Sequence, residues 1–291
     1  MCGAEQEISR EIKTMHTRGR TAGIVLGTFA CYILGFLLLR RYFYPVLRRI
    51  CGFLHITYIG GYFAAALFEL ALLLFVLLMM TCTGQLRVLR APRGTFFRGL
   101  FTGGFMIAMG LYAIVSAVIS RMGSIAFQGK GTILFSTVLF IFTGMAEEFM
   151  FRGITADVLL RGGSGAAITF GHVWMSVFIS GLLFGLMHAL NFLSARPEGV
   201  IVQMISAALI GMLIAAIYCR SGNIWVVAAI HAFNDIAAGF PTLVLRGDSG
   251  ISGIIGSYGF MHLLTLLPYG IALLFLLRRS KMKEIAEKFA P

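Results

Sequence analysis

Long apolar runs, separated by short segments with charged residues and glycines, dominate the chain. A run of about eighteen or more apolar residues can cross the hydrocarbon layer of a bilayer as a helix. The pattern contains about eight such runs and therefore predicts an all-α, polytopic transmembrane helix bundle with an intramembrane polar cavity. The expected spans lie near residues 22–39, 52–83, 99–120, 131–151, 168–193, 199–219, 223–245 and 253–277.

The amino-acid composition agrees with this interpretation and indicates one membrane domain with short polar segments at its two ends. Hydrophobic residues make up 58% of the chain, charged residues only 12%, and the mean hydropathy is +0.89. A soluble core of this length could not hide so much apolar side chain. We expect a cytoplasmic N-terminal tail over residues 1–21, the helix bundle over 22–277, and a basic cytoplasmic tail over 278–291.

The net charge of +12 arises from short basic clusters that lie between the apolar runs. Because these clusters do not form one long basic face, they predict no nucleic-acid partner. Basic residues favour the cytoplasmic side of a membrane, and their distribution places both termini there. The segment from Arg40 to Arg49 conflicts with this rule, since its four arginines would lie outside. Membrane lipid is the expected partner, and a bacterial plasma membrane is the expected location.

Few ionisable side chains fall inside the spans, and each costs several kcal/mol in lipid unless it has a partner or a function. A lone intramembrane histidine more often satisfies itself against a backbone carbonyl than takes part in chemistry. Glu69 fits a structural role as well as a functional one. The intramembrane ionisable residues are Glu69, Glu147, Glu148, Arg152, His172, His188, His231 and Asp235.

The first informative pattern is the pair of glutamates at Glu147 and Glu148, followed by Arg152. Residues four apart share a helix face, so Glu148 can form an ion pair with Arg152. Glu147 points about 100° away from Glu148 around the helix and is left to face another element. This geometry predicts a structural role for Glu148 and a chemical role for Glu147.

Two further patterns place histidines on helix faces. Phe184 and His188 are four residues apart, as are His231 and Asp235, and Asn234 lies slightly off the latter face. Gly181 and Gly185, on the helix of Phe184, would let a neighbouring helix or a peptide approach closely. Histidines and carboxylates on three apolar helices are costly, and this cost favours a functional explanation.

In this order, EEFMFRG, FGLMH and HAFND resemble the E-E-x-x-x-R, F-x-x-x-H and H-x-x-x-N/D motifs of the CAAX prenyl protease and bacteriocin-processing (CPBP or Abi) family of intramembrane endopeptidases. The resemblance covers a core of about residues 131–238. It implies that Glu147 and His188 activate the attacking water, while His231 and Asp235 stabilise the tetrahedral intermediate. It also implies a membrane-associated or prenylated peptide as substrate.

Amide hydrolysis needs an activated water, a polarised carbonyl and a proton for the leaving amine, and these residues can supply all three. Asp235 departs from the common Asn, because an ionised carboxylate cannot donate to an oxyanion. Asp235 is therefore protonated, or Asn234 donates instead, or Asp235 orients His231. We expect no required cofactor, with Zn²⁺ bound by Glu147, His188 and His231 as the alternative.

Other functions remain open at the level of sequence. A non-catalytic membrane scaffold or a bacteriocin-immunity-type binding protein could keep the same fold, and intramembrane acids and histidines also build the proton relays of transporters. The serine-containing segments 162–165 and 247–250 resemble protease nucleophile motifs, but glycine-rich runs of this kind are first of all loops. An aspartyl-protease pair needs two intramembrane Asp residues, and only Asp235 was expected inside a span.

Overall fold

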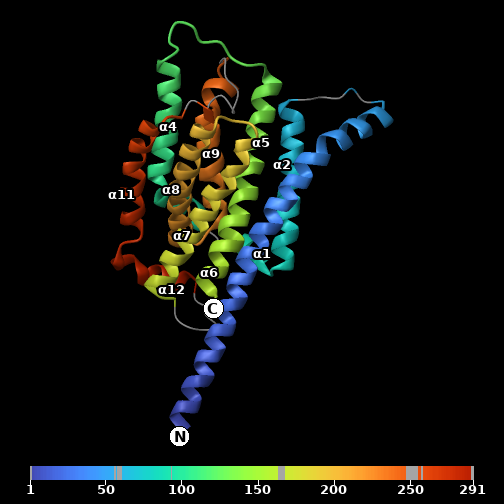
Figure 1. Cartoon of the computed structure of the whole chain (residues 1–291). Helices are drawn as coiled ribbons and strands as arrows, with labels where there is room; N and C mark the ends of the chain where they lie inside the picture. The colour runs from blue at the N-terminus through green and yellow to red at the C-terminus, as the bar shows by residue number, and fades with distance from the viewer. Residues whose placement is uncertain are drawn as a thin grey trace.

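The computed structural model describes residues 2–55, 57, 61–92, 94–162, 168–246, 255–256 and 258–289, with side chains from residue 19 onward. Its helices run mostly side by side in one bundle, and α1 crosses the side of the bundle at a slant (Figure 1). The N-terminal half holds α1 (Cys2–Phe53), α2 (Tyr62–Cys82), η1 (Gln85–Leu89), α3 (Thr95–Thr102), α4 (Gly104–Ile119), α5 (Lys130–Glu148) and η2 (Phe149–Ala156). The C-terminal half holds α6 (Asp157–Arg161), α7 (Phe170–Met187), η3 (His188–Leu193), α8 (Pro197–Ser221), α9 (Ile224–Leu243), η4 (Phe260–Leu266), α11 (Leu267–Leu276), η5 (Arg279–Lys281) and α12 (Met282–Phe289).

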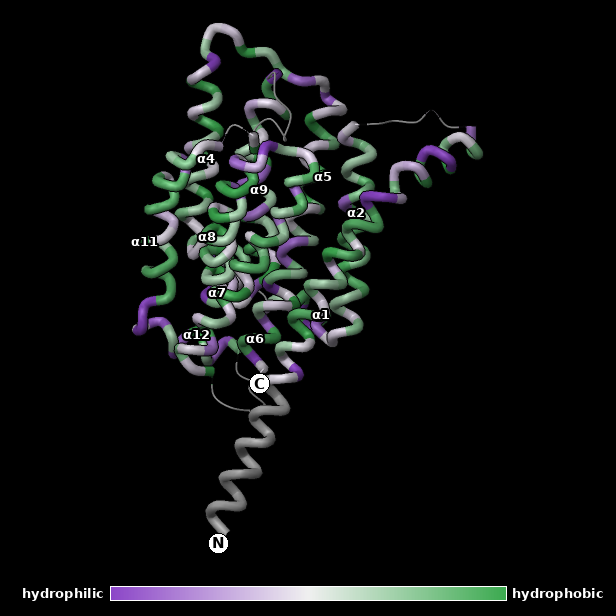
Figure 2. The backbone as a smooth tube through the Cα atoms, viewed as in Figure 1, coloured by the Kyte–Doolittle hydropathy of each residue, from purple (hydrophilic) through white to green (hydrophobic). Residues whose placement is uncertain are grey.

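Six helices of the described residues are long and apolar enough to cross a membrane, or up to eight if two bent pairs each count as one span. The bent pairs are α3 with α4, at 69°, and residues 260–276 with 279–289, at 52°. The protein is thus an all-α, polytopic integral membrane bundle, as predicted. Hydrophobic residues predominate along the helices of the bundle (Figure 2).

Three predicted spans have different limits in the structure. The span predicted at 52–83 covers only Tyr62–Cys82. The first candidate span covers 19–53, so the arginines from Arg40 to Arg49 lie on a continuous helix and not in an outer loop. The span predicted at 131–151 extends to Arg161, because helical turns continue through η2 and α6. Hydropathy marked the apolar part of each helix, whereas backbone hydrogen bonding continues into its charged flanks.

Helix α5 packs against α2 and α9, and α8 packs against α7, α11, α3 and α9, so α5 and α8 hold the bundle together. A Cβ atom on Gly181 would come within 2.6 Å of the Met212 backbone nitrogen, and one on Gly185 within 2.6 Å of the Met204 carbonyl oxygen. The close approach predicted for these glycines is therefore made by a neighbouring helix, α8.

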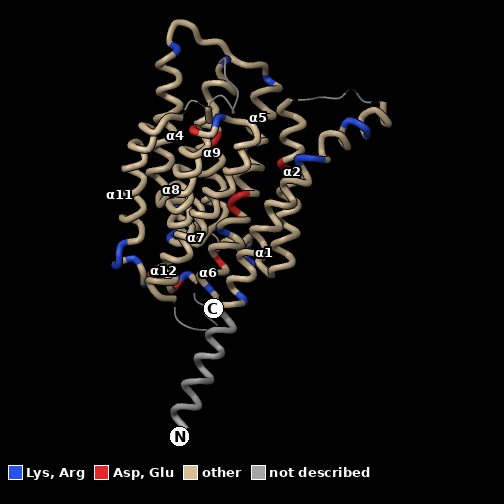
Figure 3. The backbone as a smooth tube through the Cα atoms, in the orientation of Figure 1, with Lys and Arg blue, Asp and Glu red and all other residues tan. Residues whose placement is uncertain are grey.

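Among the described residues, the Lys and Arg positions lie mostly toward the two ends of the bundle, and a few Asp and Glu positions lie between them (Figure 3). α12 lies at the same end as the connection from α2 to α3 and the beginning of α1 (Figure 1). Which side of the membrane this end faces stays a prediction, as does the bacterial membrane.

Candidate active site

The candidate site begins where α5 changes from α-helical to π-helical geometry, directly after Glu148. Single π-helical turns inside α-helices are frequent at functional sites and disturb the regular pairing of backbone carbonyls. Two serines of α7 bind such carbonyls: the Ser176 hydroxyl donates to the Ala156 oxygen and the Ser180 hydroxyl to the Phe151 oxygen, both at 2.9 Å. α7 therefore holds the π-helical segment in place.

Glu148 and Arg152 form a fully buried ion pair, as the four-residue spacing predicted. Arg152 Nη1 donates to Glu148 Oε1 at 2.8 Å, and both side chains are 0% exposed. Arg152 Nη2 also donates to the Gly211 carbonyl of α8 at 2.7 Å, and the guanidinium lies 4.9 Å from the centre of the Phe184 ring. One arginine thus connects the end of α5 to both α7 and α8.

The imidazole of His231, on α9, is the meeting point of three carboxyl groups. Its Nδ1 lies 2.6 Å from Glu148 Oε1, and its Nε2 lies 3.4 Å from Glu147 Oε2 and 3.5 Å from Asp235 Oδ2. Because Glu148 Oε1 is paired with a guanidinium and acts as an acceptor, Nδ1 carries the proton that this contact shares. The structure adds a contact to the predicted pair: Glu148 holds His231 as well as Arg152, and Glu147 faces the same ring.

The three carboxyl side chains around His231 differ in how much of their surface is exposed. The Glu148 side chain is 0% exposed, that of Glu147 is 12% exposed, and that of Asp235 is 29% exposed. A substrate or water can therefore reach Asp235 and Glu147, while Glu148 is sealed behind them. Glu148 has the surroundings of a structural group, and Glu147 those of a reactive one.

A close approach of α5 and α9 makes these contacts possible. A Cβ atom on Gly144 would lie 2.9 Å from the Ala232 backbone nitrogen and 3.1 Å from the Ala228 carbonyl oxygen. Any side chain at this position would have to move the two backbones apart. Gly144, one turn before the glutamates, thus lets them reach His231, and sequence analysis did not identify it.

His188 lies at the C-terminal end of α7, where η3 begins. Its Nδ1 is 2.9 Å from the Phe184 carbonyl oxygen and so carries the proton, which leaves Nε2 as an acceptor without a partner among the described residues. The Phe184 ring makes edge contacts with the rings of both His188, at 5.0 Å, and His231, at 5.6 Å between centroids. Phe184 is therefore the common neighbour of the two predicted catalytic histidines.

The other predicted polar residues have partners of their own. The Asn234 amide donates to the Ile230 carbonyl of its own helix at 2.8 Å, and is thereby engaged away from His231. His172 caps the start of α7, where its backbone nitrogen and Nδ1 both contact Thr169 at 3.3 Å. Glu69, on α2, interacts with the Thr143 side chain and electrostatically with Asp235.

A second buried carboxylate, Asp157, was missed because the span was predicted to end before it. Its side chain is 0% exposed and accepts from Arg87 at 3.0 Å, Arg161 at 3.1 Å and the Tyr218 hydroxyl at 3.2 Å. Two cations and a hydroxyl satisfy this group, which gives it a structural role. The expectation that Asp235 is the only aspartate inside a span was therefore wrong. The serine-containing segments 162–165 and 247–250 lie almost wholly outside the described residues.

No three or more His, Cys, Asp or Glu side chains of the described residues are arranged so that they could hold a metal ion. The set proposed for zinc, Glu147, His188 and His231, is therefore not preassembled in this geometry. Metal dependence stays a prediction to be tested by experiment.

The fold and the site together define a polytopic membrane protein with carboxylates and imidazoles clustered between its helices. Residues 129–237 match the model of the family described as type II CAAX prenyl endopeptidase Rce1-like. This segment contains all three motifs, and the match supports their resemblance to the CAAX prenyl protease-like family. The curated proteins and the solved structures give no match to the chain.

Proposed function

We propose that this protein is an intramembrane endopeptidase that hydrolyses a peptide bond of a membrane-associated or lipidated peptide. The observation that carries the proposal is the convergence of Glu147, Glu148 and Asp235 on the His231 imidazole, inside the segment that matches the family. Such a set is expensive between apolar helices, and its partial exposure gives a substrate access to it.

In the proposed mechanism, Glu147 and His188 activate a water molecule. The carboxylate of Glu147 takes a proton as the water oxygen attacks the scissile carbonyl carbon, and His188 Nε2 accepts the second hydrogen bond of that water. Collapse of the tetrahedral intermediate breaks the C–N bond, and the proton held by Glu147 passes to the leaving amine. The free Nε2 of His188 and the partly exposed Glu147 support these roles.

His231 stabilises the oxyanion in this proposal, because its Nδ1 is held by buried Glu148 and its Nε2 faces the accessible side of the cluster. For Nε2 to donate, the ring must be doubly protonated, and the three surrounding carboxyl groups favour that form. Asp235 then orients Nε2, which is the third of the roles open to it, since the Asn234 amide is bound to its helix backbone.

The test uses the purified full-length protein in proteoliposomes with a farnesylated peptide that ends in a CAAX sequence, and follows cleavage by mass spectrometry. We expect Glu147→Gln and His188→Gln each to reduce cleavage by about a hundredfold or more, as general acid–base groups do. His172→Gln is the matched control, because it removes an imidazole from the same helix as His188 while glutamine keeps the capping contact.

Cleavage that survives Glu147→Gln would contradict the proposal. The proposal would also be wrong if the protein binds the farnesylated peptide but cleaves neither this peptide nor an unprenylated membrane peptide. That result would favour a non-catalytic binding protein. Melting temperatures of all three variants separate loss of chemistry from loss of fold.

A further inference from the structure

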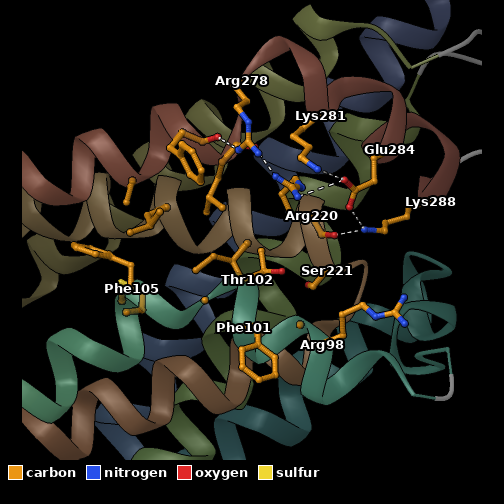
Figure 4. Close-up of a pocket in the computed structure, with 18 of the residues that line it drawn as sticks. Arg98, Phe101, Thr102, Phe105, Arg220, Ser221, Arg278, Lys281, Glu284 and Lys288 are labelled. Carbon is orange, nitrogen blue, oxygen red and sulfur yellow. Dashed lines mark hydrogen bonds and ion pairs between the residues drawn. The ribbon is translucent and has the colours of Figure 1, made fainter.

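A cavity of about 750 Å³ lies among α3, α4, α8, α11 and α12, and none of the residues of the three motifs lines it. Figure 4 shows its charged side chains gathered toward one end and Phe105 toward the other. The cavity is bounded by both bent helix pairs, where the chain turns at the end of the bundle that holds α12.

The charged end has an excess of positive charge. Among the described residues that line the cavity, Glu284 is the single acidic one, against five basic ones: Arg98, Arg220, Arg278, Lys281 and Lys288. Three of these already meet Glu284, with Lys288 at 2.8 Å, Lys281 at 3.3 Å and Arg220 at 3.4 Å. One carboxylate balances one positive charge, so the end of the cavity stays strongly cationic.

Hydrogen-bond donors also remain unused at this end. Within the described part of the chain, neither the buried Nε of Arg220 nor the Arg98 guanidinium has a hydrogen-bond partner. In Figure 4, Arg98 comes from the wall opposite to Arg220 and Glu284. An anion with several acceptor oxygens would satisfy donors from both walls.

The opposite end of the cavity is apolar and continues onto the lipid-facing surface. Phe105 lies at this end (Figure 4), and two further lining rings, Phe101 and Phe275, are 87% and 61% exposed. Phe275 lies beside the basic end, because its ring centre is 4.1 Å from the Arg278 guanidinium. In a polytopic membrane protein such exposed rings contact acyl chains. The cavity thus joins a cationic end to an apolar end, as the shape of a phospholipid requires.

We propose that this cavity binds an anionic phospholipid, with its phosphate at the basic end and an acyl chain along the aromatic end. Phosphate oxygens match the geometry of guanidinium and ammonium donors. A free phosphate would use the basic end alone and leave the apolar wall without an occupant. The bound lipid also bridges α3 to the α8–α12 contact and so fixes α12 against the bundle.

The test measures lipid retained by the purified full-length protein in detergent after equilibration with phosphatidylglycerol or phosphatidylcholine, by native mass spectrometry. We expect a discrete complex with phosphatidylglycerol that phosphatidylcholine does not match. Arg98→Gln should weaken it about fivefold, the effect of one basic residue beside anionic lipid. Arg90→Gln is the matched control, because Arg90 is also exposed and precedes α3, but does not line the cavity.

Equal binding of the two lipids, or equal weakening by the two substitutions, would overturn the proposal, since either result means nonspecific surface attraction. Displacement of phosphatidylglycerol by inorganic phosphate would instead assign the site to the free anion. Equal melting temperatures of the two variants without added lipid confirm that both fold, and the cleavage assay is independent of this result.

Discussion

Arg152 offers the sharpest test of how the candidate site is held together. Its guanidinium is fully buried and is bound to Glu148 at 2.8 Å and to the Gly211 carbonyl at 2.7 Å. Arg152→Met keeps much of the volume and removes the charge. Glu148 then keeps only His231 as a partner, and the Gly211 carbonyl loses its side-chain donor.

Breaking a buried ion pair from one side costs about 3–5 kcal/mol, because the remaining charge is left without compensation. We therefore expect Arg152→Met to lower the free energy of unfolding by that amount. The double variant Arg152→Met with Glu148→Leu removes both charges and should recover most of this loss, since apolar replacement of a complete pair is often close to neutral.

The measurement is equilibrium unfolding in mixed micelles of mild detergent and sodium dodecyl sulfate, followed by tryptophan fluorescence. Cleavage is measured on the same samples. A loss below about 1 kcal/mol in Arg152→Met would refute the buried-pair argument, as that is the level of an exposed pair. A double variant less stable than Arg152→Met would show that Glu148 is stabilised chiefly by His231, at 2.6 Å.

Three further outcomes follow from the structure. Gly144→Ala should lower the free energy of unfolding by about 1–3 kcal/mol and reduce cleavage, because the new Cβ would lie 2.9 Å from the Ala232 nitrogen. Gly27→Ala is the control and should leave the unfolding midpoint and cleavage unchanged, because no described atom lies within 4 Å of the new Cβ. Ser180→Ala should cost about 1–3 kcal/mol in the same assay by leaving the buried Phe151 carbonyl without its hydroxyl donor. Exhaustive chelation should leave cleavage intact, with little metal in the purified protein by mass spectrometry; stoichiometric zinc, loss on chelation and recovery with added zinc would contradict this.

Hydropathy and helical periodicity were enough to predict the class of fold and most of the chemistry-bearing residues. Apolar runs must span lipid as helices, so the all-α bundle followed from hydropathy alone. The pairing of Glu148 with Arg152 followed from helical periodicity, because residues four apart are neighbours whatever the tertiary structure. The three motifs indicated a family resemblance, and the matching family model covers residues 129–237, which contain all of them.

Only the tertiary structure decided which groups meet across helices. The contact of Glu148 with His231 joins residues 83 positions apart, and local periodicity carries no information about such pairs. The close approach at Gly144, the serine donors of α7 and the partners of Asp157 could not be predicted for the same reason. Each depends on how one helix is placed against another. Hydropathy registers how apolar a segment is, whereas the contacts between buried polar groups depend on helix rotation and separation.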